Sequence, residues 1–496
     1  MTEKGLVKFR IFFPVLSGYL LINIGFVIIT TISLKYDITF SHTAKNLMRQ
    51  GILSSIYFST LIYDPVSVNN VSVRPCKEQN NINYANYIRI EKFIEKQKNL
   101  HIQEINNEKI RANRFYFGYQ PYDEPRLVKL REKYQLNEVT ASASNDFEAA
   151  VLLRNWARSQ FRRRDYQPRM VNFDALRVLD NNLRNDQNEL YDPMRYYDPC
   201  NFFPLFYCQL MVSMGYQARL VQISHTGYSG HGMAEIWSDH YKKWIAMDAE
   251  LNLYYEKDGM PLNLLEIHDE RYEKKPSRVK IVRGEQHSGD ISTTLAFLGV
   301  KDLDVNKMIQ YHSYFRIADM RNDWMTNHYF KGHPKRSDFS SLFFTDHKMQ
   351  SVFNLGPETD EIKDFYWTLN QTEIFIKKNS YSKKMPLAFK TFTPNFRQFE
   401  IWVDDLIKTV SKGPVFTWTL HPGENKLMVR SVNQYGIYGI SSFVKVQLIE
   451  NSDEAELNKT LLQTGASLQR VNVSSVCKVG NGVRRKLFHR NYKDLF

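Results

Sequence analysis

A cysteine, a histidine and an aspartate stand where the sequence pattern favours regular structure, and together these residue types could perform nucleophilic catalysis. Cys200 follows Asp198 and Pro199, a pair typical of a helix start. A thiol in the first helical turn faces the positive end of the helix dipole, which favours the reactive thiolate. His231 opens the stretch HGMAEIW, and Asp248 ends the stretch WIAMD. The pattern predicts a triad in which His231 accepts the proton of Cys200 and Asp248 orients the imidazole.

The start of the helix relative to Cys200 has two interpretations, because Pro204 follows closely. If the helix begins at Pro199, Pro204 removes the backbone hydrogen bond to the Cys200 carbonyl and kinks the helix. If the helix begins nearer Asn201, Cys200 lies just outside it and the effect of the dipole weakens. Cys208 lies two turns further along the apolar run and is predicted to be a small buried hydrophobic residue.

Two helices and two strands must hold the site, and their apolar patterns identify them. Residues 145–161 place Phe147, Trp156 and other apolar residues at helical spacing, which predicts an amphipathic helix with Trp156 in the core. The helix that contains Cys208 ends at Gly215, a typical C′ position. GHGMAEIWS and KKWIAMDAELNLYY alternate or run apolar and predict strands. Two adjacent antiparallel strands would set the imidazole beside the carboxylate, and a helix packed on their sheet would bring the thiol.

The same residues resemble the core of the transglutaminase-like superfamily, over about residues 145 to 269. That superfamily includes transglutaminases, peptide:N-glycanases and many bacterial cysteine-peptidase-like proteins. The stretch EIWSDHYKKWIAMDAELN is similar to the peptide:N-glycanase branch and to uncharacterised bacterial members. The positions that carry the resemblance are Cys200, Gly215, Arg219, His231, Glu235, Trp244 and Asp248. The resemblance implies a papain-like thiol fold in which Cys200 is the nucleophile, His231 the general base and acid, and Asp248 the orienting carboxylate.

Supporting residues of the same region are expected from this resemblance and from the residue types. Arg219 and Glu235 are expected to be structural, paired or hydrogen-bonded near the site. Trp156 and Gln160 are candidates for stabilising an oxyanion. Trp237 lines a substrate groove or packs in the core.

A membrane segment is predicted at the start of the chain. Residues 11–34 carry no charge and are long enough to cross a hydrocarbon core of about 30 Å as a helix. Lys4, Lys8 and Arg10 precede this run, which favours a cytoplasmic N-terminus. A cleaved signal peptide is the rival interpretation, but its apolar region would be only about 7–15 residues long. We therefore expect an uncleaved anchor with the soluble part outside the cytoplasm.

Charge and cysteine content restrict the classes of partner and cofactor. The net charge of +13 is spread along the whole chain without a recognition motif, so we expect no nucleic-acid partner. The four cysteines, at positions 76, 200, 208 and 477, form no CxxC pair and match no zinc spacing. Cys76 and Cys477 could form a disulfide in an oxidising compartment, which the sequence does not decide. The expected chemistry needs neither a metal nor an organic cofactor.

The fold expected from these patterns is α+β, with a transmembrane helix, a transglutaminase-like core and a C-terminal immunoglobulin-like β-sandwich. Regular short strands separated by Gly, Pro and Asn turns after Pro386 predict the sandwich. The expected divisions are an anchor at 1–37, a helical and polar extension at 38–138, the catalytic core at 139–290, a mixed connecting region at 291–370, the sandwich at 371–450 and a polar tail at 451–496.

Two functions are compatible with this arrangement. The first is a membrane-anchored, thiol-dependent amide hydrolase or acyltransferase that acts on a protein, a peptide or a glycopeptide. The alternative is a catalytically idle transglutaminase-like platform that binds or scaffolds at the cell surface. Pro204 and the lack of a firmly assigned oxyanion donor favour the alternative. Pro199 and Pro204 both stand where the superfamily commonly has small residues, and both could alter the turn that supplies this donor. Substrate, acceptor and oligomeric state do not follow from the sequence.

Overall fold

The fold is described from a computed structural model of the chain. The structure describes residues 82–160, 175–176, 179–180, 199–225, 230–272, 278–284, 291, 294–295, 298–325, 341–345, 357–380 and 383–449, and for residues 199–201 it describes the backbone alone. The expected anchor at 11–34, the tail at 451–496, and both Cys76 and Cys477 lie outside these residues. Within the described residues, every helix is too short or too polar to cross a bilayer.

The architecture is α+β, as the sequence predicts, and the chain forms two compact units. Of the described residues, the first unit takes those in 113–237 and 244–366. The second takes those in 82–112, 238–243 and 367–449. Among the described residues, the first unit is thus one stretch interrupted by 238–243, whereas the second unit is assembled from segments that are far apart in the sequence.

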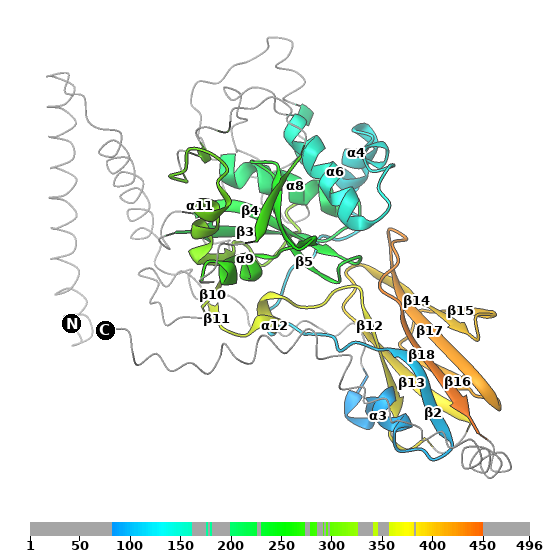
Figure 1. The fold of residues 1–496 in the computed structure, drawn as a ribbon. Helices are drawn as coiled ribbons and strands as arrows, with labels where there is room; N and C mark the ends of the chain where they lie inside the picture. The colour runs from blue at the N-terminus through cyan, green and yellow to red at the C-terminus, as the bar shows by residue number, and fades with distance from the viewer. Residues whose placement is uncertain are drawn as a thin grey trace, which may run out of the picture. The chain divides into compact units, whose positions relative to one another are not determined.

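A nine-stranded sheet forms the framework of the first unit (Figure 1). Its main path runs β11-β10-β9-β3-β4-β5-β6-β7, and β8 pairs with β6. The strands are β3 (Ala218–Ser224), β4 (Gly230–Ser238), β5 (Lys243–Asp248), β6 (Leu253–Lys257), β7 (Met260–Pro261), β8 (Val279–Arg283), β9 (Tyr314–Ile317), β10 (Leu342–Phe344) and β11 (Glu358–Thr359). The strands expected around His231 and Asp248 are confirmed as β4, β5 and β6. Strands β9 to β11 lie in the region expected to be a mixed connection, and they extend this sheet.

Helices accompany this sheet, and two of them bear on the predicted site. The helices of this unit with described bounds are α4 (Pro125–Lys133), α5 (Leu136–Val139), α6 (Asp146–Ser159), α8 (Pro199–Ser213), α9 (Leu264–Glu270), α11 (Val305–Gln310), the 3-10 helix η2 (Tyr311–Ser313) and α12 (Ile362–Phe365). Helix α6 packs against α8, and α8 packs on β3 (Figure 1). The helix and the sheet that carry the three predicted site residues therefore belong to one packed unit.

Helix α6 confirms the expected amphipathic helix, but its buried face differs from the expected one. Asn145 caps its start by accepting a hydrogen bond from the Glu148 N–H at 3.0 Å. The fully buried face contains Ala150, Leu153 and Ala157, whereas Trp156 is half-buried. Small residues let α6 approach its neighbours closely, and this close packing turns the larger side chain to the edge of the interface.

Helix α8 begins at Pro199 and contains Pro204, which decides between the two expected starts. Its end confirms the expected C′ glycine, because Gly215 has a φ of 88°. The Gly215 N–H donates to the Val212 carbonyl at 3.1 Å, and the Tyr216 N–H donates to the Met211 carbonyl at 3.1 Å. This pair of bonds is a Schellman motif, which satisfies carbonyls at the end of the helix.

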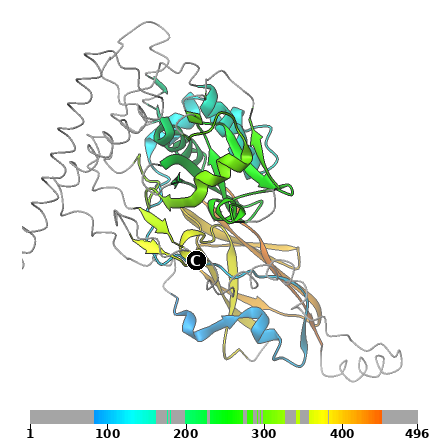
Figure 2. The same ribbon diagram turned by 60° about the vertical axis from the view of Figure 1, so that its left-hand side comes forward.

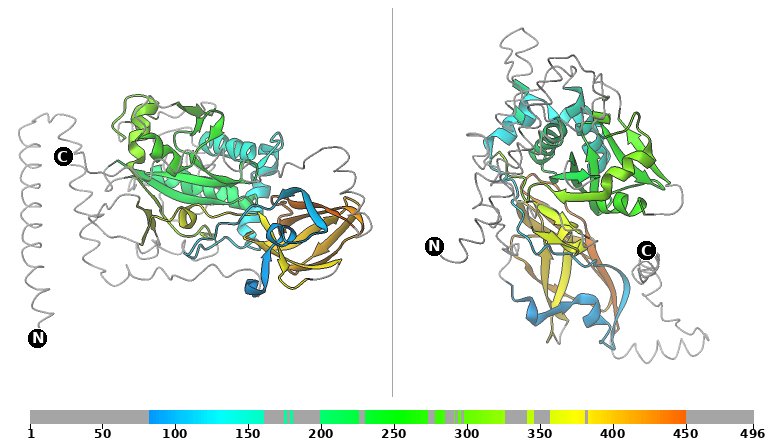
Figure 3. Two further views of the ribbon diagram at one scale, coloured as in Figure 1. Left: turned by 60° about the horizontal axis from the view of Figure 1, so that its bottom comes forward. Right: turned by 90° about the vertical axis from the view of Figure 1, so that its left-hand side faces the viewer.

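The second unit consists of two sheets around one apolar core (Figure 3). The four-stranded sheet has the order β1 (Tyr87–Arg89), β12 (Thr372–Lys377), β13 (Lys384–Thr391) and β16 (Val415–Thr419). The five-stranded sheet has the order β15 (Ile407–Ser411), β14 (Phe396–Val403), β17 (Gly423–Asn433), β18 (Ser442–Leu448) and β2 (Leu100–Asn106). Side chains from both sheets share the core, among them Ile374, Phe389, Phe399, Trp418 and Val444.

Strands β1 and β2 lie in the range expected to be a helical and polar extension. With η1 (Tyr84–Asn86) and α3 (Ile90–Ile94), they join the second unit, where β2 pairs along β18 (Figure 2). The pairing register between β2 and β18 shifts at Lys445 and Val446 of β18. The alternation of apolar residues along β2 is therefore interrupted. A short strand with a broken pattern, whose partner is far away in the sequence, gives little local signal.

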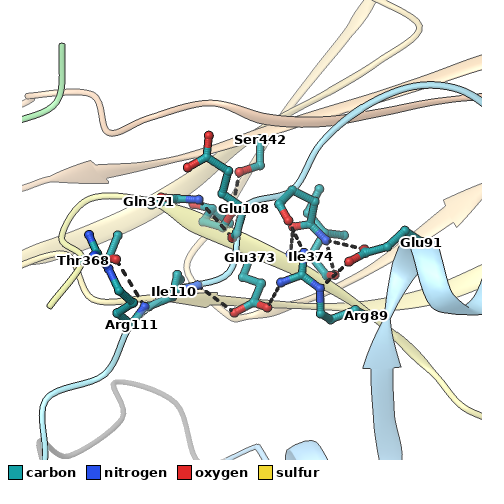
Figure 4. Close-up of polar contacts among 12 residues, drawn as sticks. Arg89, Glu91, Glu108, Ile110, Arg111, Thr368, Gln371, Glu373, Ile374 and Ser442 are labelled. Carbon is teal, nitrogen blue, oxygen red and sulfur yellow. Dashed lines mark hydrogen bonds and ion pairs between the residues drawn. The ribbon is translucent and has the colours of Figure 1, made fainter. Parts of the chain in front are cut away.

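Polar contacts bind this early segment to β12 and to the residues just before it (Figure 4). Arg89 is hydrogen-bonded to Glu373, and the Ile110 N–H donates to the same carboxylate at 3.3 Å. Gln371 donates to the Glu108 carbonyl at 3.0 Å, and the Arg111 N–H donates to Thr368 at 3.2 Å. Residues 89–111 are therefore a structural part of the second unit.

Candidate active site

His231 and Asp248 meet inside the first unit, as the sequence predicts. They lie on β4 and β5, which are neighbours in the sheet. His231 Nε2 is 2.7 Å from Asp248 Oδ2, and the two side chains are 0% and 1% exposed. Because an ionised carboxylate can only accept, Nε2 of the neutral imidazole carries the proton. Nδ1 is then the nitrogen that can act as a base.

The backbone that follows β5 fixes the orientation of Asp248. Its second oxygen, Oδ1, accepts a hydrogen bond from the Leu251 N–H at 2.8 Å. Both carboxylate oxygens are therefore engaged, one by the turn and one by His231. A carboxylate held in this way restricts rotation of the imidazole, which is the role expected for Asp248.

Cys200 lies in the first turn of α8, and its side chain is outside the described part of the structure. Helix α8 packs on β3, and β3 pairs directly with β4, the strand of His231. Pro204 has no N–H to offer the Cys200 carbonyl, so the regular helical hydrogen bond is missing at this point. Of the three predicted site residues, the structure therefore joins two and places the third on a helix of the same unit.

A buried ion pair braces β4 close to His231. Arg219 on β3 donates to Glu235 through Nε at 3.0 Å and Nη2 at 2.5 Å, and both side chains are 0% exposed. Leu264 N and the Tyr366 hydroxyl donate to the other oxygen of Glu235 at 3.0 and 3.2 Å. The guanidinium also lies 4.2 Å from the centre of the Trp244 ring. The expected pairing of Arg219 with Glu235 is confirmed.

Glu250 is a further residue of this cluster that the sequence analysis did not single out. Its side chain is 5% exposed, and its Oε2 atom lies 3.9 Å from His231 Nδ1. The Thr294 hydroxyl donates to the other oxygen. Burial raises the pKa of the Glu250 carboxyl group. An acidic residue two positions after Asp248, in MDAELN, is the sequence signal that could have identified it.

Two arginines of α6 balance the negative charge of this cluster. Arg154 is fully buried, and its Nε donates to Asn252 Oδ1 at 3.0 Å. Burial lowers its pKa to about 10, while the charge of Asp248 acts in the opposite direction. Burial also lowers the pKa of Arg158, and the charges of Glu250 and Asp248 oppose that shift. The buried face of α6 thus supplies cations to the two acidic residues.

Other residues considered in the sequence analysis have local packing roles in the structure. Trp237 is 2% exposed and packs edge-on against Trp244, with ring centres 6.0 Å apart, so it belongs to the core. Cys208 is fully buried, as predicted, and burial raises the pKa of its thiol. Gln160 donates to the Trp156 carbonyl at 3.4 Å at the end of α6. Oxyanion roles for Trp156 and Gln160 remain predictions.

The described residues contain no group of three or more His, Cys, Asp or Glu side chains that could hold a metal ion. The described geometry offers an imidazole fixed by a carboxylate, beside a second carboxyl group. Comparisons of the chain with protein-family models, with curated proteins and with solved structures find no match. The likeness to the transglutaminase-like superfamily accordingly remains a prediction from the residues quoted above.

Proposed function

We propose that this protein is a membrane-anchored, thiol-dependent amide hydrolase or acyltransferase that uses Cys200, His231 and Asp248. The observation that supports this most directly is the buried hydrogen bond between His231 and Asp248. Burying this pair costs free energy, because both groups lose contact with water. A histidine held by a buried carboxylate, whose other oxygen accepts from a backbone N–H, is the arrangement expected of an oriented catalytic base.

In the proposed reaction, His231 Nδ1 takes the thiol proton and the Cys200 thiolate attacks the amide carbonyl. The imidazolium then returns the proton to the departing amine, which leaves an acyl-thioester on Cys200. Water or another amine attacks this thioester and releases the acid or the new amide. Backbone N–H groups near Cys200 would hold the oxyanion, a contribution of about 3 kcal/mol per donor. The substrate class is an amide of a protein, a peptide or a glycopeptide.

An idle platform is the second candidate, and Pro204 is the observation that favours it. This proline lies inside α8, one turn after Cys200. The missing hydrogen bond changes the geometry of the turn that would supply the oxyanion donor. On this alternative, the second unit would perform the function by binding a glycan or a protein at the cell surface.

Alkylation of the protein by iodoacetamide as a function of pH separates the two candidates. Peptide-resolved mass spectrometry reports Cys200 apart from the buried Cys208, which serves as the internal control. A free thiol ionises at roughly pH 8.5. If the protein is an enzyme, Cys200 should react at a pH well below that value. His231→Ala should remove this reactivity at low pH. A Cys200 that titrates like a free thiol in the unmodified protein would refute the catalytic function and support the platform.

A further inference from the structure

The imidazole of His231 lies between two acidic side chains, one at each ring nitrogen. Asp248 Oδ2 is 2.7 Å from Nε2, and Glu250 Oε2 is 3.9 Å from Nδ1. The proposed reaction assigns the proton of the thiol to Nδ1. Glu250 therefore faces the nitrogen that changes its charge, whereas Asp248 faces the nitrogen that keeps its proton.

The surroundings of Glu250 direct one of its oxygens to the imidazole. Thr294 donates to Oε1, and among the described residues Oε2 has no hydrogen-bond donor. Among the described residues, the charged and titratable groups that act on Glu250 are His231 from β4, Asp248 from β5 and Arg158 from α6. The buried His312 from η2 acts in turn on His231. A buried carboxyl group with one unsatisfied oxygen is costly in free energy. A positive charge that forms 3.9 Å away would offset part of that cost.

We propose that Glu250 is a positioning residue that stabilises the protonated form of His231. This inference rests on the proposed function, because it concerns the proton that leaves the Cys200 thiol. In that step the S–H bond breaks, an N–H bond forms at Nδ1, and the imidazole becomes a cation. Glu250 and Asp248 then hold this cation from opposite sides. Thr294 keeps the Glu250 carboxyl group pointed at the ring.

The test measures the rate at which iodoacetate alkylates Cys200 across the pH range, by peptide-resolved mass spectrometry of the full chain. Alkylation requires the thiolate, which is the nucleophile. Because iodoacetate is an anion, a neighbouring imidazolium accelerates its reaction. The rate should rise as the thiol ionises and fall as His231 loses its proton. Glu250→Gln keeps the size of the side chain and its contact with Thr294, but it removes the charge.

In Glu250→Gln, the falling limb should move to lower pH by roughly one unit, since a charge within about 4–6 Å typically shifts a pKa by 1–3 units. Glu250→Asp should restore more than half of that shift. Thr294→Val keeps the Glu250 carboxyl group but removes the hydrogen bond that orients it. This variant should shift the falling limb in the same direction as Glu250→Gln, but by less. Glu132→Gln, an exposed position on α4, is the matched control and should leave the profile unchanged.

A falling limb at the same pH in folded Glu250→Gln and in the unmodified protein would overturn the inference. If Glu250→Gln does not fold, Thr294→Val decides in the same way, and an unmoved limb again overturns it. These outcomes are distinct from failure of the proposed function. That failure would appear in the unmodified protein itself, as a single rise near the pH of a free thiol.

Discussion

At the scale of single residues, the arrangement of His231 separates the tasks of its two nitrogens. Nε2 is committed to Asp248, and this bond is buried on both sides. Nδ1 faces the acidic Glu250 at a distance that leaves room for movement. The orientation of the ring therefore depends on Asp248, whereas the proposed effect of Glu250 concerns the charge of the ring.

Asp248→Asn should reduce the reaction rate strongly with little loss of stability. The side-chain oxygen of the asparagine at this position could still accept from the Leu251 N–H. Its amide NH₂ group would instead donate to His231 Nε2, which favours the imidazole tautomer that carries its proton on Nδ1. We expect incorporation of a fluorescent primary amine into casein to fall by about 10²–10⁴-fold in kcat. Asp302→Asn, at an exposed position, is the control and should retain full activity. Equal rates in Asp248→Asn and the unmodified protein would contradict the role of Asp248.

The contact between His231 and Asp248, and the place of Cys200 in the first turn of α8, could be predicted because each residue has a distinctive local context. His231 and Asp248 stand at the two ends of apolar strands, and Cys200 stands at a helix start. Glu250 lacked such a context, because an acidic residue after a strand is normally an exposed turn residue. Its burial depends on Thr294 and Arg158, which are distant in the sequence and meet it only in the folded unit.

At the scale of elements, α8 combines an irregular start with a well-defined end. Pro204 interrupts the hydrogen bonding of the first turns, while the Schellman motif at Gly215 fixes the last one. Between these two points, the apolar side chains of α8 are buried in the core of the first unit. The position of Cys200 therefore depends on packing and on the C-terminal cap more than on helical bonds near the thiol.

Gly215→Ala should destabilise the first unit by about 1–2 kcal/mol. The φ of 88° at this position forces a Cβ atom toward the neighbouring carbonyl oxygen. Urea unfolding followed by circular dichroism measures the change. Gly413→Ala is the control, because this glycine has open space around it and a φ outside the left-handed region. A variant as stable as the unmodified protein would show that the cap does not hold α8.

Elements with a strong local pattern were predictable, and those defined by distant partners were not. The strong patterns are those of α6, α8 and β4 to β6. The helices are indicated by their caps and the strands by their apolar residues, and both signals lie within the segment itself. Strand β2 pairs with β18 across most of the chain, so no nearby residue indicates it. The buried face of α6 was also missed in part, because it contains alanines and arginines instead of large apolar residues.

At the scale of the whole molecule, the second unit depends on a segment that precedes the first unit in the sequence. Arg89 joins β1 to β12 through Glu373, and it also binds Glu91 and the Asn107 carbonyl. The side chain of Glu373 is 5% exposed, so its charge has little access to water. This contact ties early and late parts of the chain together.

Arg89→Met should destabilise the second unit by about 2–3 kcal/mol, because it leaves the Glu373 carboxylate buried without its cation. Hydrogen exchange followed by mass spectrometry should show faster exchange in peptides that cover β2 and β12. Peptides of β4 and β5 in the first unit should exchange as before. Arg397→Met, an exposed substitution on β14, is the control. Unchanged protection of β12 in Arg89→Met would contradict the structural role of this contact.

The pairing of β2 with β18 has a consequence for synthesis on the ribosome. A contact such as that between Asn106 and Ser441 spans 335 residues, so the early strand is made long before its partner exists. During this interval the first unit can fold, while the nascent β2 waits with unpaired backbone groups. The two sheets of the second unit can therefore close around their core only after β18 has been made.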